Sequence, residues 1–200
     1  MKYPLWKRIF DLIVALVGLV FILPFTPLIA MTIKFESKGP VVVKLERVSE
    51  GKKIWVYKFR SMVKNAPELK DTLAHLNERK DGPLFKIKND PRLTKVGKFL
   101  RKFRLDEFPQ LMNVLKGELA IVGPRPREPH EAALYPDKYK KVLEVRQGVT
   151  GLSQVSGASS LPFIKEIELD KSYTENITLT GDLKILLKTI AILFFDPTAV

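Results

Sequence analysis

Apolar residues are concentrated in one uncharged run near the N-terminus, which reads LIVALVGLVFILPFTPLIAMTI from Leu12 to Ile33. About 20 apolar residues are enough for a transmembrane helix, so this run has the length of a membrane segment. Pro24 and Pro27 interrupt it and should bend or break the helix, because proline lacks a backbone donor. At about 1.5 Å per residue, the arm before Pro24 rises only about 18 Å, short of the hydrocarbon core of about 30 Å.

Cationic residues flank this run on both sides, with Lys2, Lys7 and Arg8 before it and Lys34 and Lys38 after it. A spanning helix usually carries a cationic bias on one side only. The two charged flanks and the central break therefore favour a re-entrant hairpin with both ends on the cytoplasmic face. A kinked span and a cleaved signal peptide are the alternatives, because membrane helices tolerate proline and signal peptides also contain an apolar segment.

The remaining patterns predict a predominantly helical α+β fold, with a membrane anchor at residues 1–38 and a second domain at residues 39–200. VVVKLERVS and KKIWVYKFR flank Glu50-Gly51, which predicts a small β-hairpin. Leucine spacing predicts a helix over residues 67–79. Further helical patterns cover Leu93–Phe103, Ile164–Tyr173 and Asp182–Phe195.

The pattern of Leu93–Phe103 places four apolar residues on one helical face, with lysines and arginines elsewhere. A basic amphipathic helix of this kind can lie on an acidic membrane surface. An ordinary surface helix packed on a core has the same pattern, so both interpretations stay open.

Composition narrows the possible chemistry. A net charge of +12, from 34 Lys and Arg against 22 Asp and Glu, indicates an anionic partner such as nucleic acid, acidic lipid or a phosphorylated substrate. The absence of Cys excludes disulfides, thiolate-bound metals and thiol nucleophiles. His75 and His130 are the only histidines, which excludes a multi-histidine metal site. Any metal must therefore have oxygen ligands, as Mg²⁺, Mn²⁺ and Ca²⁺ prefer.

One candidate site is the pair Asp106 and Glu107, followed by Pro109. Proline is tolerated in a first helical turn, so the pair is predicted at or just before the start of a helix that runs to about Leu115. Free amides and the helix dipole there favour carboxylates and bound phosphate. An ionised Asp can attack phosphorus, and a neighbouring carboxylate can hold Mg²⁺. Acidic residues in a first turn are also common without any catalytic role.

Basic side chains supply candidate phosphate contacts. In Gly123-Pro124-Arg125-Pro126, two prolines stiffen the loop that presents Arg125, whose guanidinium suits phosphate oxygens. Lys58 and Arg60 occur in YKFRSM at the end of the second predicted strand. Taken alone, the Pro-Arg-Pro string favours a proline-rich connector with solvated arginines. Lys58 and Arg60 are equally compatible with a solvated strand edge.

Together these motifs resemble the monotopic phosphoglycosyl transferases, bacterial sugar transferases that start glycan assembly on polyprenyl phosphate. The resemblance covers nearly the whole chain, and the matching motifs follow one another in the same order as in the family. These are KRIFD before the proline-broken apolar run, GPVVV, YKFRSM, DPRLTKVGKFLRK, RLDEFPQLMNVLKGELAIVGPRP, GVTGLSQVSG and ELDKSYTENITLTGDLKILLKT. The chain resembles the small members, which consist of the catalytic unit alone.

The resemblance implies a two-step exchange, in which an Asp attacks the β-phosphate of a UDP-sugar, UMP leaves, and polyprenyl (undecaprenyl) phosphate takes the phosphosugar. It makes Asp106 the nucleophile, Glu107 a ligand of the cofactor Mg²⁺, and Arg125 a contact of the phosphate or of the uridine diphosphate. Lys58, Arg60 and Arg101 match basic positions and become weaker phosphate contacts. Pro24 matches the proline that breaks the membrane helix.

The same resemblance predicts a catalytic domain at residues 39–200 on the cytoplasmic face of the bacterial inner membrane. It implies anionic lipid as a further partner and no nucleic acid, and it leaves the sugar, the glycan pathway and the oligomeric state open. Three positions depart from the family pattern: Leu23 replaces a frequent Ser, Gln147 a frequent Pro, and Ala158 a frequent Arg. The last two bear on the substrate pocket.

A different class of function is a membrane-anchored basic adaptor that binds acidic lipid or nucleic acid without chemistry. An inactive paralogue is a third possibility, disfavoured because the Asp-Glu pair and the Pro-Arg-Pro loop are both intact. Only an enzyme needs Asp106 and Glu107 beside convergent cations, so the geometry around this pair is the discriminating observation.

Overall fold

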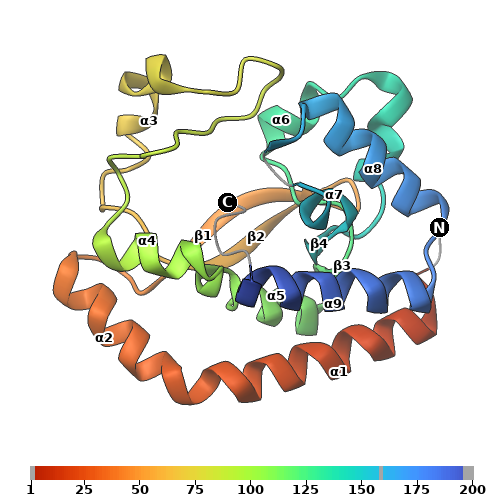
Figure 1. Cartoon of the computed structure of the whole chain (residues 1–200), viewed down its shortest axis with the longest axis horizontal. Coiled ribbons are helices and arrows are strands. Elements are labelled where there is room, and N and C mark those ends of the chain that lie inside the picture. The colour runs from red at the N-terminus through yellow and green to blue at the C-terminus, as the bar shows by residue number, and fades with distance from the viewer. Residues whose placement is uncertain (1–2, 158–159, 196–200) are drawn as a thin grey trace.

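The computed structural model describes residues 3–157 and 160–195, a predominantly helical chain with two two-stranded sheets (Figure 1). The elements follow in the order α1 (Leu5–Ile22), η1 (Leu23–Phe25), α2 (Thr26–Glu36), β1 (Val42–Ser49), β2 (Lys52–Phe59), α3 (Leu69–Thr72), η2 (Ala74–Leu76), α4 (Lys95–Lys102), η3 (Leu105–Glu107), α5 (Gln110–Lys116), β3 (Ala120–Val122), α6 (Pro129–Ala133), η4 (Asp137–Leu143), β4 (Gly148–Thr150), α7 (Leu152–Val155), α8 (Phe163–Glu175) and α9 (Leu179–Phe195).

The apolar segment is helical and bends where the prolines predict it. The 3₁₀ turn η1, which contains Pro24, separates α1 from α2, and the bend is plain in Figure 1. There the Thr26 amide donates to Leu23 O rather than to Ile22 O. The Thr26 hydroxyl donates to Ile22 O at 3.1 Å. The hydroxyl that position 23 lacks is thus supplied three residues later.

By length and composition, the helix Leu5–Glu36 is long and apolar enough to cross a membrane. Its outer face is strongly apolar, since Val17, Val20 and Phe35 are 65%, 72% and 84% exposed. The other elements lie on the inner side of the bend (Figure 1). An apolar face of this size points to a contact with lipid or protein.

The predicted hairpin is confirmed. Strands β1 and β2 pair antiparallel from Val42↔Phe59 to Ser49↔Lys52. Glu50 and Gly51 turn with positive φ of 51° and 69°, as a two-residue hairpin loop requires. Because side chains alternate along a strand, Arg47 and Lys58 share one face of the hairpin.

The N-terminal helix is attached to the small parallel sheet of β3 and β4, which pair at Ala120↔Gly148 and Val122↔Thr150. Lys7 Nζ donates to Val122 O at 3.0 Å, and Asp11 Oδ1 accepts from the Ile121 amide at 2.9 Å. Lys7 also pairs with Asp182 of α9 at 2.5 Å. Both members of this ion pair are buried, so α1, β3 and α9 are held together by one polar cluster.

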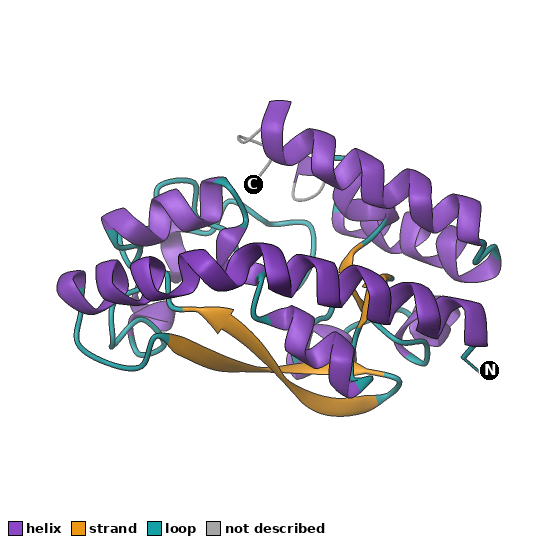
Figure 2. Ribbon diagram, turned by 90° about the horizontal axis from the view of Figure 1, so that it is seen from below, coloured by secondary structure: helices purple, strands orange, loops and turns teal. Residues whose placement is uncertain are grey.

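A second attachment joins α1 to α5. The Arg8 guanidinium donates to Val114 O and Leu115 O, at 2.6 and 2.7 Å, and so satisfies carbonyls at the end of α5. Close packing is possible because a Cβ at Gly18 would lie 2.7 Å from Leu111 Cδ1. In Figure 2 the long N-terminal helix crosses the molecule with the hairpin on one side and α9 on the other. The same helix therefore supports elements on both of its own sides.

All four helices predicted outside the apolar segment and the Asp-Glu region differ in extent from those observed. The predicted helix over 67–79 is only α3 and the short turn η2, because its leucines are at most half-buried and no core stabilises it. The helix predicted over Leu93–Phe103 is α4, whose first amides, those of Lys95 and Val96, donate to the Glu36 carboxylate at 2.6 and 2.7 Å. The predicted C-terminal helices are present and extended as α8 and α9.

Candidate active site

The Asp-Glu pair lies in a tight turn immediately before α5. Asp106 and Glu107 form the end of the 3₁₀ turn η3, and α5 begins at Gln110 and ends at Lys116. Arg104, with a left-handed φ of 51°, starts this turn. The prediction that the pair lies just before a helix that includes Leu115 is confirmed.

The Glu107 carboxylate is held between two predicted cations. Its Oε1 lies 2.5 Å from Lys58 Nζ and 3.9 Å from Arg125 Nη2, and the side chain is 16% exposed. Burial opposes ionisation, but the charges of Lys58 and Arg125 outweigh it and lower the pKa of Glu107 to about 2. Glu107 is therefore a fixed anion that brings the hairpin, η3 and the Pro-Arg-Pro loop together.

Asp106 has a different environment. Its side chain is buried, and in the described part of the chain no cation pairs with its carboxylate within 4.0 Å. Burial raises the pKa of Asp106, the charge of Glu107 adds to this, and Lys58 and Arg101 oppose it. Adjacent carboxylates whose pKa values are driven apart are typical of active sites, where the two groups have different roles.

The other two predicted cations lie in different places. Arg101 lies near enough for its charge to act on Asp106 and Glu107, and its Nε donates to Ser61 Oγ at 3.0 Å. Arg60 is not brought to the cluster. Its guanidinium donates to Pro40 O and Ser37 O at 2.6 and 2.5 Å, and so ties the end of β2 to the end of α2.

The Pro-Arg-Pro loop is fixed at both ends. It starts directly after β3, and Arg125 is 41% exposed on its surface. Arg127, two residues later, is buried, donates to Tyr135 Oη at 3.1 Å and pairs with Glu166 at 2.7 Å. The Val48 amide donates to Arg127 O at 3.0 Å, which joins the loop to β1. Arg125 is thus presented from a rigid support.

The sequence pattern of the bacterial sugar transferase family matches residues 2–196. The chain belongs to this family. It is 40% identical over 190 residues to the undecaprenyl-phosphate galactose phosphotransferase of Salmonella typhimurium. The matched region covers 92% of this chain and 39% of that protein. It is 37% identical over 188 residues to the exopolysaccharide production protein ExoY of Rhizobium meliloti. That match covers 92% of this chain and 83% of ExoY.

A third relative, the UDP-glucose:undecaprenyl-phosphate glucose-1-phosphate transferase of Klebsiella pneumoniae, is 37% identical over 207 residues, with 97% of this chain and 41% of that protein covered. This bacterial sugar transferase therefore spans about two fifths of the length of the Salmonella and Klebsiella relatives. It spans most of the length of ExoY.

Two of the three departures from the family pattern lie in the described residues. Leu23 is 67% exposed in the bend of the N-terminal helix. Gln147 is fully buried and its amide donates to Val142 O and Val145 O at 2.9 and 2.8 Å, so it braces the turn before β4. Ala158 lies outside the described residues.

One buried carboxylate of this sugar transferase is not indicated by the sequence motifs. Asp170 on α8 is fully buried beside the Ser153 hydroxyl and the backbone amide of Arg125, and within residues 3–157 and 160–195 no donor makes a hydrogen bond of standard geometry to its carboxylate. Burial raises its pKa to about 6. Ile167 and Tyr173, three residues away on each side, are also buried, so helical spacing marks Asp170 as an acid on an inward face.

Replacing Asp170 by Asn should make stability less dependent on pH. The folded protein binds the extra proton between the usual pKa of 3.8 and the raised value of about 6, so Asp170 costs stability as the pH rises through this window. The variant should therefore gain up to about 3 kcal/mol relative to the parent between pH 4 and pH 7. Unfolding curves at both pH values check this, and a difference independent of pH would contradict it.

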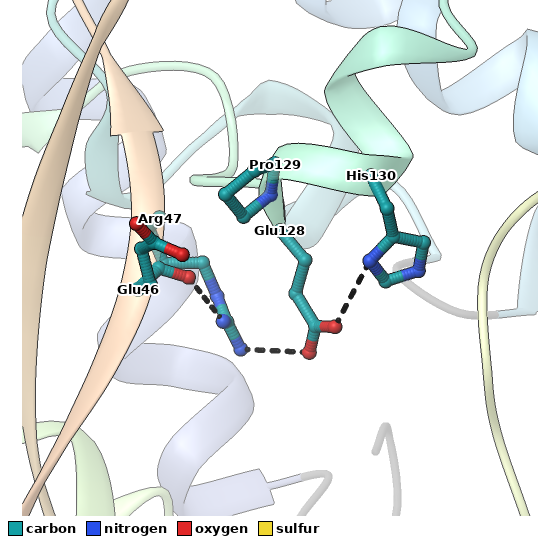
Figure 3. A pocket seen from close by; sticks show the side chains of 5 residues that line it. All are labelled: Glu46, Arg47, Glu128, Pro129 and His130. Carbon is teal, nitrogen blue, oxygen red and sulfur yellow. Dashed lines mark hydrogen bonds and ion pairs between the residues drawn. The ribbon is translucent and has the colours of Figure 1, made fainter. Parts of the chain in front are cut away.

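A second polar cluster lies beside the loop, in a pocket of about 390 Å³ lined by Glu46, Arg47, Glu128, Pro129 and His130 (Figure 3). Glu128 lies at its centre, 3.4 Å from Arg47 Nη2 and 3.4 Å from His130 Nδ1. Lys70 Nζ also donates to Glu128 at 3.0 Å. Ligand atoms of Glu128, His130 and Glu131 lie within 4.8 Å of one another, so this group could also hold a metal ion.

Proposed function

We propose that this chain transfers a sugar phosphate from a UDP-sugar to polyprenyl (undecaprenyl) phosphate, as the first membrane step of bacterial glycan assembly. The observation that carries the proposal is the turn at Asp106 and Glu107. There a carboxylate held by two cations adjoins a buried carboxylate that forms no ion pair with any described residue. The names of the Salmonella and Klebsiella relatives support the same class of reaction.

In the first proposed step, an Asp106 carboxylate oxygen attacks the β-phosphorus of the UDP-sugar. The bond from that phosphorus to the oxygen bridging the α-phosphate breaks, and UMP leaves with the bonding electrons. Arg125 and Lys58 lie where they would contact phosphate oxygens, and guanidinium groups suit this geometry. An aspartyl phosphosugar remains.

In the second step, a phosphate oxygen of polyprenyl phosphate attacks the phosphorus of the aspartyl phosphosugar. The acyl phosphate bond breaks, and Asp106 is released as a carboxylate. The product is a polyprenyl-diphosphate-sugar. Covalent catalysis of this kind needs one carboxylate that no permanent ion pair neutralises. The buried Asp106 side chain, which pairs with no cation in the described part of the chain, supports this role.

The donor set of this turn fits Mg²⁺. Carboxylate oxygens are its preferred protein ligands, and one or two carboxylates with substrate phosphates commonly complete its shell. Glu107 would hold the ion, with Oε1 remaining close to Lys58. When bound, Mg²⁺ neutralises charge on the diphosphate of the donor.

The proposed location is the bacterial inner membrane, with residues 1–38 as a re-entrant anchor and residues 39–200 on the cytoplasmic face. The bend at Pro24 and the exposed apolar outer face of α1 and α2 support this arrangement. The lysines of α4 would contact anionic lipid. No nucleic acid partner is proposed.

The re-entrant arrangement predicts that tags at both ends are accessible only from the cytoplasm. A cysteine introduced near the N-terminus and one introduced after α9 should both resist a membrane-impermeant reagent in intact spheroplasts and react after lysis. Because the chain has no Cys, each introduced thiol reports one position. Labelling of the N-terminal thiol in intact spheroplasts would contradict the hairpin and favour a kinked span.

The activity is tested with purified protein in lipid nanodiscs, Mg²⁺, polyprenyl phosphate and a panel of UDP-sugars. We expect UMP release with acceptor and a protein-bound phosphosugar without it. A membrane-anchored adaptor would bind anionic lipid and release no UMP from any donor, so that result would replace the enzyme with the adaptor.

A further inference from the structure

The hairpin face that carries Lys58 continues from the proposed reaction centre to the pocket of Figure 3. Arg47 lies on that face and is paired across the strands with Ile54, four residues before Lys58. At about 3.3 Å per residue, Arg47 lies about 13 Å along the hairpin from Lys58. Val56 lies between them on the same face and is buried.

The Pro-Arg-Pro loop makes the same connection from the other side. Only two residues lie between Arg125, beside Glu107, and Glu128 in the pocket, so the Cα atoms of Arg125 and Glu128 are at most about 11 Å apart. Burial and the charge of Arg125 lower the pKa of Arg47, while the charges of Glu128 and Glu107 oppose this shift. The Arg47 guanidinium therefore lies within the electrostatic field of both sites.

The pocket is polar and offers donors and acceptors together. Arg47 is 20% exposed, Glu128 31% and His130 55%, so all three side chains can reach a ligand. Figure 3 shows Glu128 between Arg47 and His130, with the Pro129 ring above them. A volume of about 390 Å³ is within the range of small-molecule sites.

The distance from the reaction centre selects the part of the donor that this pocket can hold. In a UDP-sugar the sugar is attached directly to the β-phosphate, whereas the nucleoside follows the α-phosphate and a methylene group. Because Arg47 lies about 13 Å along the hairpin from Lys58, its pocket suits the nucleoside. Carboxylates bind ribose hydroxyls, and the two uracil carbonyls accept hydrogen bonds from cations and imidazole.

We propose that the pocket between Arg47, Glu128 and His130 binds the nucleoside end of the UDP-sugar donor. This assignment rests on the proposed function, and it makes Arg47 and Glu128 determinants of donor affinity that the motifs of the sequence did not indicate. The departing UMP remains bound there after the first step, so UMP should compete with the donor through the same residues.

Steady-state kinetics of Arg47→Met in nanodiscs tests the assignment. The KM for UDP-sugar and the inhibition constant of UMP should both rise about tenfold, as the loss of a charged hydrogen bond predicts. The kcat and the KM for polyprenyl phosphate should change less than about twofold. His130→Ala should give a smaller rise of about threefold in both donor constants, and its exposed position makes misfolding an inadequate explanation.

Lys140→Met is the matched control, because it removes one positive charge from an exposed ion pair with Asp137 on η4. It should leave every constant unchanged. An unchanged UMP inhibition constant in Arg47→Met would overturn the nucleoside assignment. If the KM for the donor rose in that variant while the UMP constant did not, the pocket would bind the sugar of the donor instead of its nucleoside.

A parent protein that releases no UMP would refute the proposed function instead. Calorimetric titration with UMP then still tests the pocket, since Arg47→Met should weaken binding about tenfold relative to the parent. Equal binding by the two proteins would overturn the inference in that case too.

Discussion

Replacement of Asp106 by Asn is expected to reduce UMP release at least about a thousandfold and to abolish the protein-bound phosphosugar. An amide cannot supply the anionic oxygen that attacks phosphorus, and losses of nucleophiles in covalent catalysis are of this order or larger. The measurement is UMP release in nanodiscs with acceptor, and capture of radiolabelled phosphosugar without it.

Stability distinguishes this effect from unfolding. Burial raises the pKa of Asp106, so the ionised carboxylate is costly to the fold. The Asn variant should therefore unfold at the same temperature as the parent or slightly above it. Asp137→Asn, at a side chain that is 93% exposed, is the control and should keep full turnover. Retained UMP release in Asp106→Asn would remove Asp106 from the mechanism.

Replacement of Lys7 by Met is expected to have the largest effect on stability. Lys7 and Asp182 are 2% and 0% exposed, so the substitution leaves a buried carboxylate without its cation. Breaking a buried pair in this way costs about 3–5 kcal/mol. For a chain of this size the unfolding temperature should fall by roughly 10 °C, measured by the fluorescence of Trp6 and Trp55 in nanodiscs.

Two further variants make this prediction specific. Lys53→Met breaks the pair with Glu46 in which Lys53 is 68% exposed, and should change the unfolding temperature by no more than about 2 °C. The double variant Lys7→Met, Asp182→Leu should recover part of the loss, because no unpaired charge stays buried. If Lys7→Met matched Lys53→Met, the polar cluster would not hold α1 to the rest of the fold.

Local chemistry explains which elements were predicted well. The hairpin depends on alternation in neighbouring strands and on a turn at Glu50-Gly51, all within 18 residues. The bend depends on Pro24, which acts on its own helix. The helix over 67–79 was predicted too long, because its leucine spacing needed a core that the tertiary structure does not provide there.

The cationic side chains of the N-terminal motif, by contrast, have partners that local sequence does not indicate. Lys7 and Arg8 were interpreted as charges that flank a membrane segment, yet both contact the rest of the protein. Lys7 reaches Asp182, 175 residues away in sequence. Lys7 and Arg8 therefore do not indicate how the segment is oriented in a membrane, whereas Pro24 still lies in the bend of the helix.

By itself, the sequence determined the family, the Asp-Glu turn, the hairpin and the proline bend, because each depends on contiguous residues with distinctive chemistry. Only the tertiary structure decided that Lys58 and Arg125 converge on Glu107, that Arg60 caps carbonyls after α2, and that Asp170 lies beneath the Arg125 loop. A basic side chain has the same sequence signature whether it meets phosphate, a carboxylate or a carbonyl. Its partner is set by packing between segments that are distant in the chain.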